Sequence, residues 1–307
     1  MQIEGKSVGL AFKVFSISVW ILCCAYVAVT IYRTGALQVV SQSILEYTSA
    51  FVLVIALYVL SCLGIAAAFA FLVWGVSAGQ RLRADIIGVH AITQIAKYLP
   101  TNTLHLVGRH AVLRRRGLSD VVLVGAGLIE IVLLLLAAVG LAALGASDEL
   151  ATHLDLDQRS LAIIGALIAA LVLIAAAVLR ANPTVLVSLS LTWRAAAGAS
   201  VAISVYCVFF TLSGVTLWVL LAQAIQVPVP PDIVRLTSYA AISWSIGFVS
   251  PGAAAGIGVR ETILILLLAG AVEPAPATSA AVAYRLVTTL GDLITWALAG
   301  IWWWTRR

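Results

Sequence analysis

The apolar residues of the chain are concentrated in long uninterrupted stretches. A helix that crosses the hydrocarbon core of a bilayer needs about 20 such residues in succession. The first stretch follows Lys6 and Lys13 and is too long for the core of a signal peptide, so we expect it to be retained as a membrane span. In all, the pattern predicts six spanning helices, at residues 14–32, 50–78, 121–144, 161–179, 197–224 and 278–304.

Two further apolar stretches are interrupted and fail as single spans. Residues 85–109 form an amphipathic segment that breaks at Pro100. Residues 233–272 form two short apolar pieces that are broken at Ser250-Pro251-Gly252. Short pieces with a proline between them are typical of helical hairpins that enter the membrane and return to the same side. We therefore expect re-entrant hairpins at about 84–113 and about 233–272.

The composition agrees with a helical membrane protein. Apolar residues make up 63% of the 307 residues and charged residues 10%, against roughly half and about a quarter in a soluble globular domain. With a mean hydropathy of +1.10, too little polar surface remains to cover a particle of this size in water. Because lipid offers the backbone no hydrogen bonds, we expect an all-α integral membrane protein with six transmembrane helices and two re-entrant hairpins.

The basic residues are distributed asymmetrically along this layout. If the N-terminus is cytoplasmic, 13 of the 18 basic residues fall in cytoplasmic segments, as the positive-inside rule requires. They are Lys6, Lys13, Arg81, Arg83, Lys97, Arg109, Arg114, Arg115, Arg116, Arg180, Arg194, Arg306 and Arg307. The outer segments contain Arg33, Arg159, Arg235 and Arg260, and Arg285 lies within the last span. If either hairpin crossed the membrane once, residues 114–116 or 306–307 would face outward. The charges therefore favour hairpins that return, with both termini in the cytoplasm.

The layout contains an internal repeat. Two spans, a broken hairpin and a third span occur in residues 1–146 and again in residues 161–307, with an external loop at 147–160. Because each unit has an odd number of spans, the second copy is expected to be inverted, with its hairpin entering from outside. Pro100 precedes Arg109 by nine residues, and Pro251 precedes Arg260 by the same distance. Inverted repeats whose broken helices meet near the midplane are a recurring plan of transporters.

Several short motifs stand in and near the two hairpins. They are Ile-Ala-Lys-Tyr-Leu-Pro at 95–100, Val-Gly-Arg at 107–109, Arg-Arg-Arg-Gly-Leu-Ser at 114–119, Ser-Pro-Gly at 250–252, Gly-Ile-Gly-Val-Arg-Glu at 256–261, and Ala-Tyr-Arg at 283–285 with Asp292. In this order, over nearly the whole chain, they resemble the lysylphosphatidylglycerol synthase transmembrane region family. The family usually has glycine after the first of these prolines, where this chain has Thr101.

The resemblance implies a role in moving lipid. The family includes the flippase half of the bacterial multiple peptide resistance factor, which moves aminoacylated phosphatidylglycerol between leaflets. It also includes stand-alone members, and membrane regions fused to or encoded near polyprenyl-phosphate glycosyltransferases. Because the synthase domain has no counterpart in these 307 residues, we expect no aminoacyl-transfer activity and do not expect an enzyme.

The hairpin tips are suited to binding an anion. Thr101, Asn102 and Thr103, at the first tip, and Ser250, at the second, are good N-cap residues, so each returning half-helix could point its positive N-terminal end into the membrane interior. Arg109 and Arg260 follow on these half-helices, where we expect them to occupy equivalent places, and a guanidinium binds phosphate through two parallel hydrogen bonds. The structural alternative is a proline that merely turns the chain.

Charged residues within the membrane are expensive and need partners. Arg285 and Asp292 are seven residues apart, which places both on one helix face, so we expect them to look into the same cavity. A cluster of ion pairs that only locks the fold is an equally weighted alternative. The candidate binding and gating residues are Lys97, Tyr98, Pro100, Arg109, Glu130, Pro251, Gly252, Arg260, Glu261, Tyr284, Arg285 and Asp292.

Other chemistry has little support in the sequence. His105 and His110 are five residues apart, which is off one helix face, and no His-Glu-x-x-His motif occurs. The chain has no Walker A motif and no Gly-x-Ser-x-Gly motif, and its four cysteines lie in apolar runs. We therefore expect no metal, no cofactor and no catalytic residues.

These observations predict a lipid transporter of a prokaryotic plasma (inner) membrane. We expect it to flip an anionic lipid, either an aminoacylated phosphatidylglycerol-like phospholipid or a polyprenyl-phosphate-linked sugar. One alternative is a non-transporting subunit that supports a glycosyltransferase or a lipid-modifying enzyme, and another is a membrane-embedded transferase. The sequence is compatible with a homodimer. We expect no nucleic-acid partner. A transporter requires charges that line a water-accessible cavity, whereas a scaffold would bury them in closed pairs.

Overall fold

The computed structural model describes residues 18, 20–77, 84–99, 103–145, 192–250 and 253–305, and all regular elements among them are helices. Within this part, four helices are long and apolar enough to cross a membrane, which indicates a multi-pass membrane protein. They are α3 (Thr48–Val76), α6 (Asp120–Gly145), α10 (Trp193–Val219) with its π-helical end η2 (Leu220–Ala224), and α13 (Pro274–Trp304). Each agrees with a predicted span to within four residues at either end.

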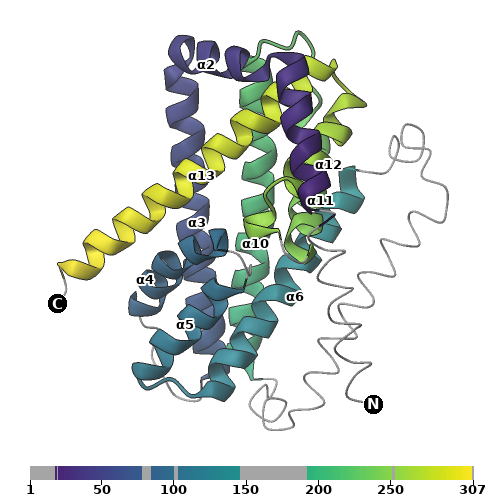
Figure 1. The fold of residues 1–307 in the computed structure, drawn as a ribbon. Helices are drawn as coiled ribbons and strands as arrows, with labels where there is room; N and C mark the ends of the chain where they lie inside the picture. Colours follow the sequence, from purple (N-terminus) through teal and green to yellow (C-terminus); the bar gives the residue numbers. More distant parts are fainter. Residues whose placement is uncertain are drawn as a thin grey trace, which may run out of the picture.

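A fifth candidate span is bent. The helix Trp20–Thr34 is followed after one residue by α2 (Ala36–Glu46), at an angle of 69°. The bend lies at Gly35, whose φ of 64° is in the left-handed region that ends helices. The sequence pattern predicts the first of these helices but not α2, which crosses the upper end of the molecule against α3, η2 and α13 (Figure 1). The predicted span at 161–179 lies outside the described residues.

The long helices pack closely where their facing residues are small. Helix α10 packs along α3, and a Cβ atom added at Gly198 would lie 2.6 Å from the carbonyl oxygen of Phe71. Small residues that let two backbones approach are typical of helix contacts in membranes. The apolar core includes Phe69 of α3 and Tyr206 and Phe210 of α10, all with less than 2% of their surface exposed.

Both segments predicted as broken hairpins contain a break. The first consists of α4 (Ala84–Thr93), the 3₁₀ helix η1 (Gln94–Tyr98) and α5 (Leu104–Arg115). The second consists of α11 (Ile233–Val249), the 3₁₀ helix η3 (Ala254–Gly256) and α12 (Val259–Ala269). In Figure 1 the first lies toward the lower end of the molecule and the second descends from the upper end. The two breaks meet, because η1 contacts η3.

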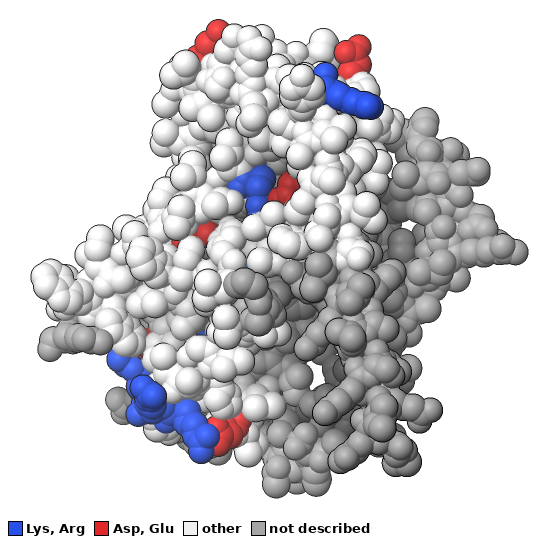
Figure 2. All heavy atoms as spheres, in the orientation of Figure 1, with Lys and Arg blue, Asp and Glu red and all other residues white. Residues whose placement is uncertain are grey.

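Charged side chains gather at the two ends of the molecule, with an almost uncharged belt between them (Figure 2). The lower end has an exposed basic turn at residues 114–116, which forms ion pairs with Asp85 and Asp120. Lys97, Arg109 and Arg260 lie between the two ends, in the broken segments, so they belong to neither face. At one point in the belt, basic and acidic atoms are visible below the surrounding surface.

Candidate functional site

Helix α13 forms one wall of the site and contacts both broken segments. It packs against α4 and η1 of the first segment and against α12 of the second. Arg285 and Asp292 stand two turns apart on it, which is about 10 Å along the axis. Arg285 joins α13 to the second segment and Asp292 joins it to the first.

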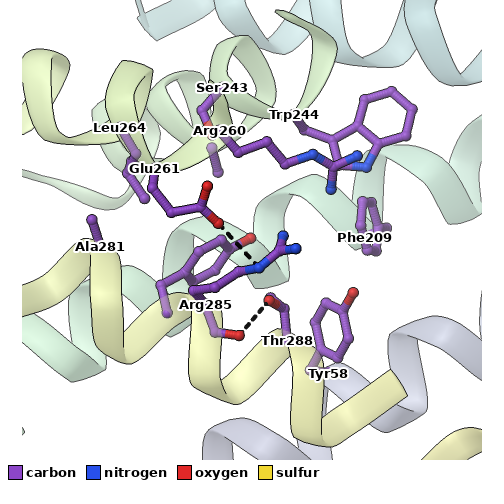
Figure 3. A pocket seen from close by; sticks show the side chains of 12 residues that line it. Tyr58, Phe209, Ser243, Trp244, Arg260, Glu261, Leu264, Ala281, Arg285 and Thr288 are labelled. Carbon is purple, nitrogen blue, oxygen red and sulfur yellow. Dashed lines mark hydrogen bonds and ion pairs between the residues drawn. The ribbon is translucent and has the colours of Figure 1, made fainter. Parts of the chain in front are cut away.

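Arg285 forms an ion pair with Glu261 at the start of α12. The Nε atom of Arg285 lies 3.0 Å from Oε1 of Glu261 (Figure 3). The other carboxylate oxygen accepts a hydrogen bond of 2.6 Å from the backbone N–H of Gly258, the residue that precedes α12. The positive end of this helix therefore already has a carboxylate at it, and the sequence alone did not indicate this.

Arg260 makes no ion pair with any described residue. Its guanidinium lies 5.5 Å from the centre of the Trp244 ring, and its Nε atom is buried without a hydrogen-bond acceptor. The side chain runs past Gly247 and Gly256, and a Cβ atom at these positions would lie 2.8 and 2.6 Å from Nε. Nη2 of Arg285 is likewise buried without an acceptor. Both arginines therefore have a buried donor without an acceptor, and both side chains line the smaller cavity (Figure 3).

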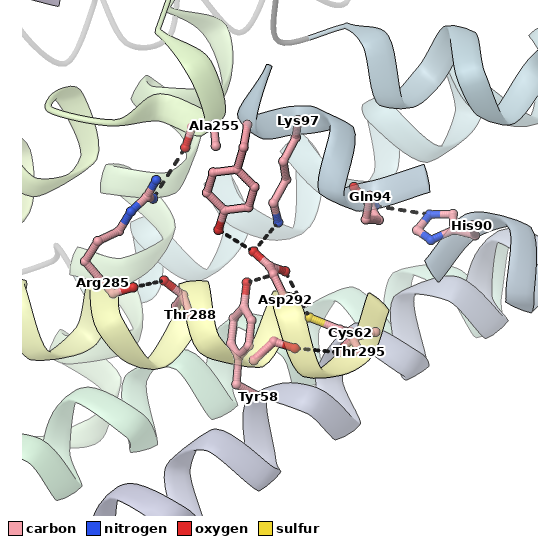
Figure 4. A network of polar contacts seen from close by, with 12 residues as sticks. Tyr58, Cys62, His90, Gln94, Lys97, Ala255, Arg285, Thr288, Asp292 and Thr295 are labelled. Atoms are coloured by element: carbon pink, nitrogen blue, oxygen red, sulfur yellow. Dashed lines mark hydrogen bonds and ion pairs between the residues drawn. The ribbon is translucent and has the colours of Figure 1, made fainter. Parts of the chain in front are cut away.

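Asp292 is the centre of a second polar cluster. Its Oδ2 atom lies 2.7 Å from Nζ of Lys97 and accepts a hydrogen bond of 2.7 Å from the hydroxyl of Tyr98 (Figure 4). On its other side, the Tyr58 hydroxyl and the Cys62 thiol of α3 donate to Oδ1 at 3.5 and 3.7 Å. The first broken segment is thus held to α13 at its tip.

Sequence reasoning missed the residues of α3 in this cluster. Tyr58 and Cys62 are four residues apart, which places them on one helix face toward Asp292. A tyrosine one turn before a cysteine within an otherwise apolar span is the signal that was available.

Arg109 belongs to a closed cluster inside the bundle. It contacts both oxygens of Glu130, through Nη1 at 3.1 Å and through a shorter bond from Nη2. His90, another residue missed by sequence reasoning, lies 2.9 Å from the same carboxylate through Nε2. The ring of Phe69 stacks below the guanidinium, 3.8 Å from its carbon. Arg109, Glu130 and His90 are each less than 5% exposed, so this cation is fully compensated and enclosed.

Two adjoining cavities lie between these clusters. The larger has a volume of about 90 Å³ and is lined by side chains of both broken segments, of α3, α6, α10 and α13. The smaller, of about 30 Å³, extends between α12 and α13. Both are lined by Tyr58, Phe209, Trp244 and Arg260, so Arg260 stands where the two cavities meet.

The equal spacing from proline to arginine does not give equal positions. Arg109 is the sixth residue of α5, whereas Arg260 is the second residue of α12. The reason is the segment before α12, where a 3₁₀ turn and left-handed residues, among them Gly258 with a φ of 82°, use up chain length without forming α-helix. The expectation that both arginines occupy equivalent places is therefore wrong.

The capping expectation is wrong at the second tip. The hydroxyl of Ser250 donates to the carbonyl of Ile246 at the end of α11, and Gly258 is the N-cap of α12. At the first tip, Thr103 occupies the expected N-cap position of α5, but its side chain makes no capping hydrogen bond, and Thr101 and Asn102 lie outside the described residues. The reason at the second tip is that the chain makes a further turn before the returning helix begins.

Most predicted site residues are brought together. Lys97, Arg109, Glu130, Arg260 and Asp292 line the larger cavity, and Arg260, Glu261, Tyr284 and Arg285 line the smaller one. Tyr98 reaches the same region through Asp292. Arg285 and Asp292 share a helix face, but Arg285 faces the smaller cavity and Asp292 the larger. Pro100, Pro251 and Gly252 lie outside the described residues.

The two histidines near the first break, His105 and His110, lie in different surroundings. His105 lines the larger cavity, whereas His110 lies 2.8 Å from Asp120 near the lower end. Among the described residues, no group of three or more His, Cys, Asp or Glu side chains is arranged to hold a metal ion.

No protein-family model matches this chain, and no curated protein is significantly similar to it.

Proposed function

We propose that this chain is a transporter that moves an anionic lipid between the two leaflets of a membrane. The observation that carries the proposal is Arg260, a cation without an ion-pair partner among the described residues, placed where two cavities meet between two broken helices. An uncompensated charge in the apolar part of a membrane protein is costly, and such residues mark substrate pathways.

A lipid phosphate supplies the missing charge. Guanidinium binds phosphate through directed hydrogen bonds, and Arg260 and Arg285 both have donors free for them. The larger cavity, at about 90 Å³, has room for roughly six water molecules. It therefore suits the polar part of a headgroup, while the acyl chains stay in the bilayer.

The proposal extends to the topology. It has two inverted units, residues 1–146 and 161–307, with six spans, two re-entrant hairpins and both termini in the cytoplasm of a prokaryotic inner membrane. Two features support it: the broken segments approach from opposite ends of the molecule, and an exposed basic turn lies at one end (Figures 1 and 2). Two related hairpins that meet near the middle of the membrane would give the site one gate toward each side of the membrane.

A non-transporting membrane subunit is the second candidate. It is favoured by the closed cluster of Arg109, Glu130 and His90, which has the enclosed pairing expected of a structural lock. Such a subunit would support a glycosyltransferase or a lipid-modifying enzyme. Neither candidate makes the chain itself an enzyme.

Reconstitution separates the two candidates. Purified protein in liposomes should move fluorescent phosphatidylglycerol from the inner to the outer leaflet, measured by chemical quenching of the outer leaflet. Arg260→Gln should reduce the rate at least about tenfold, because the uncompensated cation at the cavities is lost. Arg115→Gln, at the exposed lower end, is the matched control and should transport normally. If wild type and Arg260→Gln give the rate of empty liposomes, the subunit function replaces transport.

A further inference from the structure

We infer that the site selects a lipid with one phosphodiester charge and an otherwise uncharged, hydroxyl-bearing headgroup. This inference rests on the proposed function and narrows its substrate. It follows from the charges around the two cavities, from the occupancy of the carboxylates, and from the uncharged groups that remain free.

The charges around the cavities leave room for one anion. Four cations line the cavities, and three of them have a carboxylate partner among the described residues: Arg109 with Glu130, Lys97 with Asp292, and Arg285 with Glu261. With histidines counted as neutral, the surplus is the single charge of Arg260. A phosphodiester supplies one negative charge and balances it. A phosphomonoester or a pyrophosphate brings a second charge that has no free cation to meet it.

The carboxylates offer no place for an ammonium group. Both oxygens of Glu130 contact Arg109, and one also contacts His90. Glu261 is occupied by Arg285 and by the backbone N–H of Gly258. An aminoacylated or zwitterionic headgroup would therefore bring a cation that must break an existing pair.

The carboxylate of Asp292 is occupied in the same way. Lys97 and Tyr98 contact one oxygen, and Tyr58 and Cys62 donate to the other. The carboxylates of Glu130 and Asp292 thus have both oxygens satisfied by groups of the protein itself. The charge of Glu261 is paired with Arg285, although its Oε1 atom accepts no hydrogen bond from a described residue.

The protein groups that remain without a partner at the cavities are suited to bind the phosphate oxygens and the hydroxyls of a headgroup. Nε of Arg260 and Nη2 of Arg285 are buried donors without an acceptor, and the buried residue Ser243 lines the smaller cavity. The aromatic residues Phe209 and Trp244 also line this cavity. Aromatic faces pack against the C–H faces of a glycerol or a sugar. The hydroxyl of a serine can donate a hydrogen bond to the hydroxyls of such a headgroup and accept one from them.

Thermal unfolding in detergent micelles with added lipid tests this selectivity. A lipid that binds the folded state raises the melting temperature. Phosphatidylglycerol should raise it for the wild type and not for Arg260→Gln. Phosphatidylethanolamine and lysylphosphatidylglycerol should need at least about ten times the concentration for the same rise. Phosphatidic acid at pH 8.5, where its phosphomonoester carries a second negative charge, should also need at least about ten times the concentration of phosphatidylglycerol.

Two variants test the charge count directly. Glu261→Gln releases Arg285, and Asp292→Asn releases Lys97, so each should bring phosphatidic acid at pH 8.5 up to the effect of phosphatidylglycerol. In Glu261→Gln the new side-chain amide retains an oxygen for the backbone N–H of the helix cap. Two independent variants guard against a loss of folding in one of them.

The outcomes separate the inference from the proposed function. If lysylphosphatidylglycerol or phosphatidic acid stabilises the wild type as well as phosphatidylglycerol does, the selectivity is wrong while lipid transport stands. The same holds if both carboxylate variants fold and keep the wild-type order of lipids. If no lipid stabilises the wild type and liposomes show no transport, both the inference and the proposed function fail.

Discussion

Both terminal nitrogens of the Arg109 guanidinium bond the carboxylate of Glu130, whereas the guanidinium of Arg260 has no carboxylate partner among the described residues. Removing one partner of a buried pair leaves the other charge uncompensated and costs about 3–5 kcal/mol. Arg109→Gln should therefore lower the free energy of unfolding by about that amount. Arg260→Gln removes an unpaired charge, so it should leave stability within about 1 kcal/mol of wild type or raise it. Unfolding of the purified variants in mixed micelles measures both.

The control for this prediction is the double variant Arg109→Gln with Glu130→Gln. It removes both charges of the closed pair and should recover part of the stability lost in Arg109→Gln. If Arg260→Gln is destabilised as strongly as Arg109→Gln, then Arg260 has a partner in the folded protein and the anion site is wrong.

Gly247 permits the placement of the Arg260 side chain. A methyl group at this position would overlap the side chain near its root, where it has little freedom to move aside. Gly247→Ala should therefore displace the guanidinium and reduce lipid transport about as much as Arg260→Gln does. Gly127→Ala is the matched control, because nothing lies within 4 Å of its added methyl. Wild-type transport by Gly247→Ala would show that the position of Arg260 is not critical.

The chemistry of the site could be predicted from the sequence, but its pairing could not. Charged residues in apolar stretches are conspicuous, and Lys97, Arg260 and Asp292, which were singled out in this way, all line the larger cavity. The partner of each depends on the packing of segments far apart in the chain, which a local pattern does not contain. His90 and Tyr58 were missed for the same reason, since their roles arise from contacts with Glu130 and Asp292.

At the scale of elements, α13 joins two broken segments that are remote in sequence. The ion pair of Lys97 and Asp292 fixes the tip of the first, with side chains 19% and 5% exposed. A double-mutant cycle with Lys97→Met and Asp292→Asn should give a coupling energy of about 1–3 kcal/mol. The exposed pair of Arg114 and Asp120 is the control and should give less than about 1 kcal/mol. Equal couplings in the two cycles would mean that the tip is not held by this pair.

The predicted elements agree best where apolar residues continue for a full span. Helices α3, α6, α10 with η2, and α13 follow from length and hydropathy alone. The departures occur where glycine takes a left-handed conformation: Gly35 starts α2, and Gly256 and Gly258 delay the start of α12. Such conformations depend on the surroundings, so a glycine within an apolar stretch does not reveal by itself whether the helix ends there.

At the scale of the whole molecule, the charged groups of the described residues are concentrated at two ends and one interior site. The lower end contains the end of α5 with the exposed residues 114–116. The upper end contains α2, whose last residue is Glu46, and the start of α13, whose N-cap is Glu273 (Figure 1). An apolar belt between two charged ends matches a molecule surrounded by lipid, with water at each end.

Accessibility from the two sides of a membrane tests this arrangement. Arg115 and Glu273 are exposed at opposite ends of the molecule. Because the positive-inside rule places the basic turn in the cytoplasm, Arg115→Cys should react with a membrane-impermeant maleimide only after the cells are opened, and Glu273→Cys should react in intact cells. The unsubstituted protein, with its four native cysteines, gives the background. Labelling of both positions from outside would mean that the first broken segment crosses the membrane, and the opposed hairpins and the inverted repeat would then be wrong.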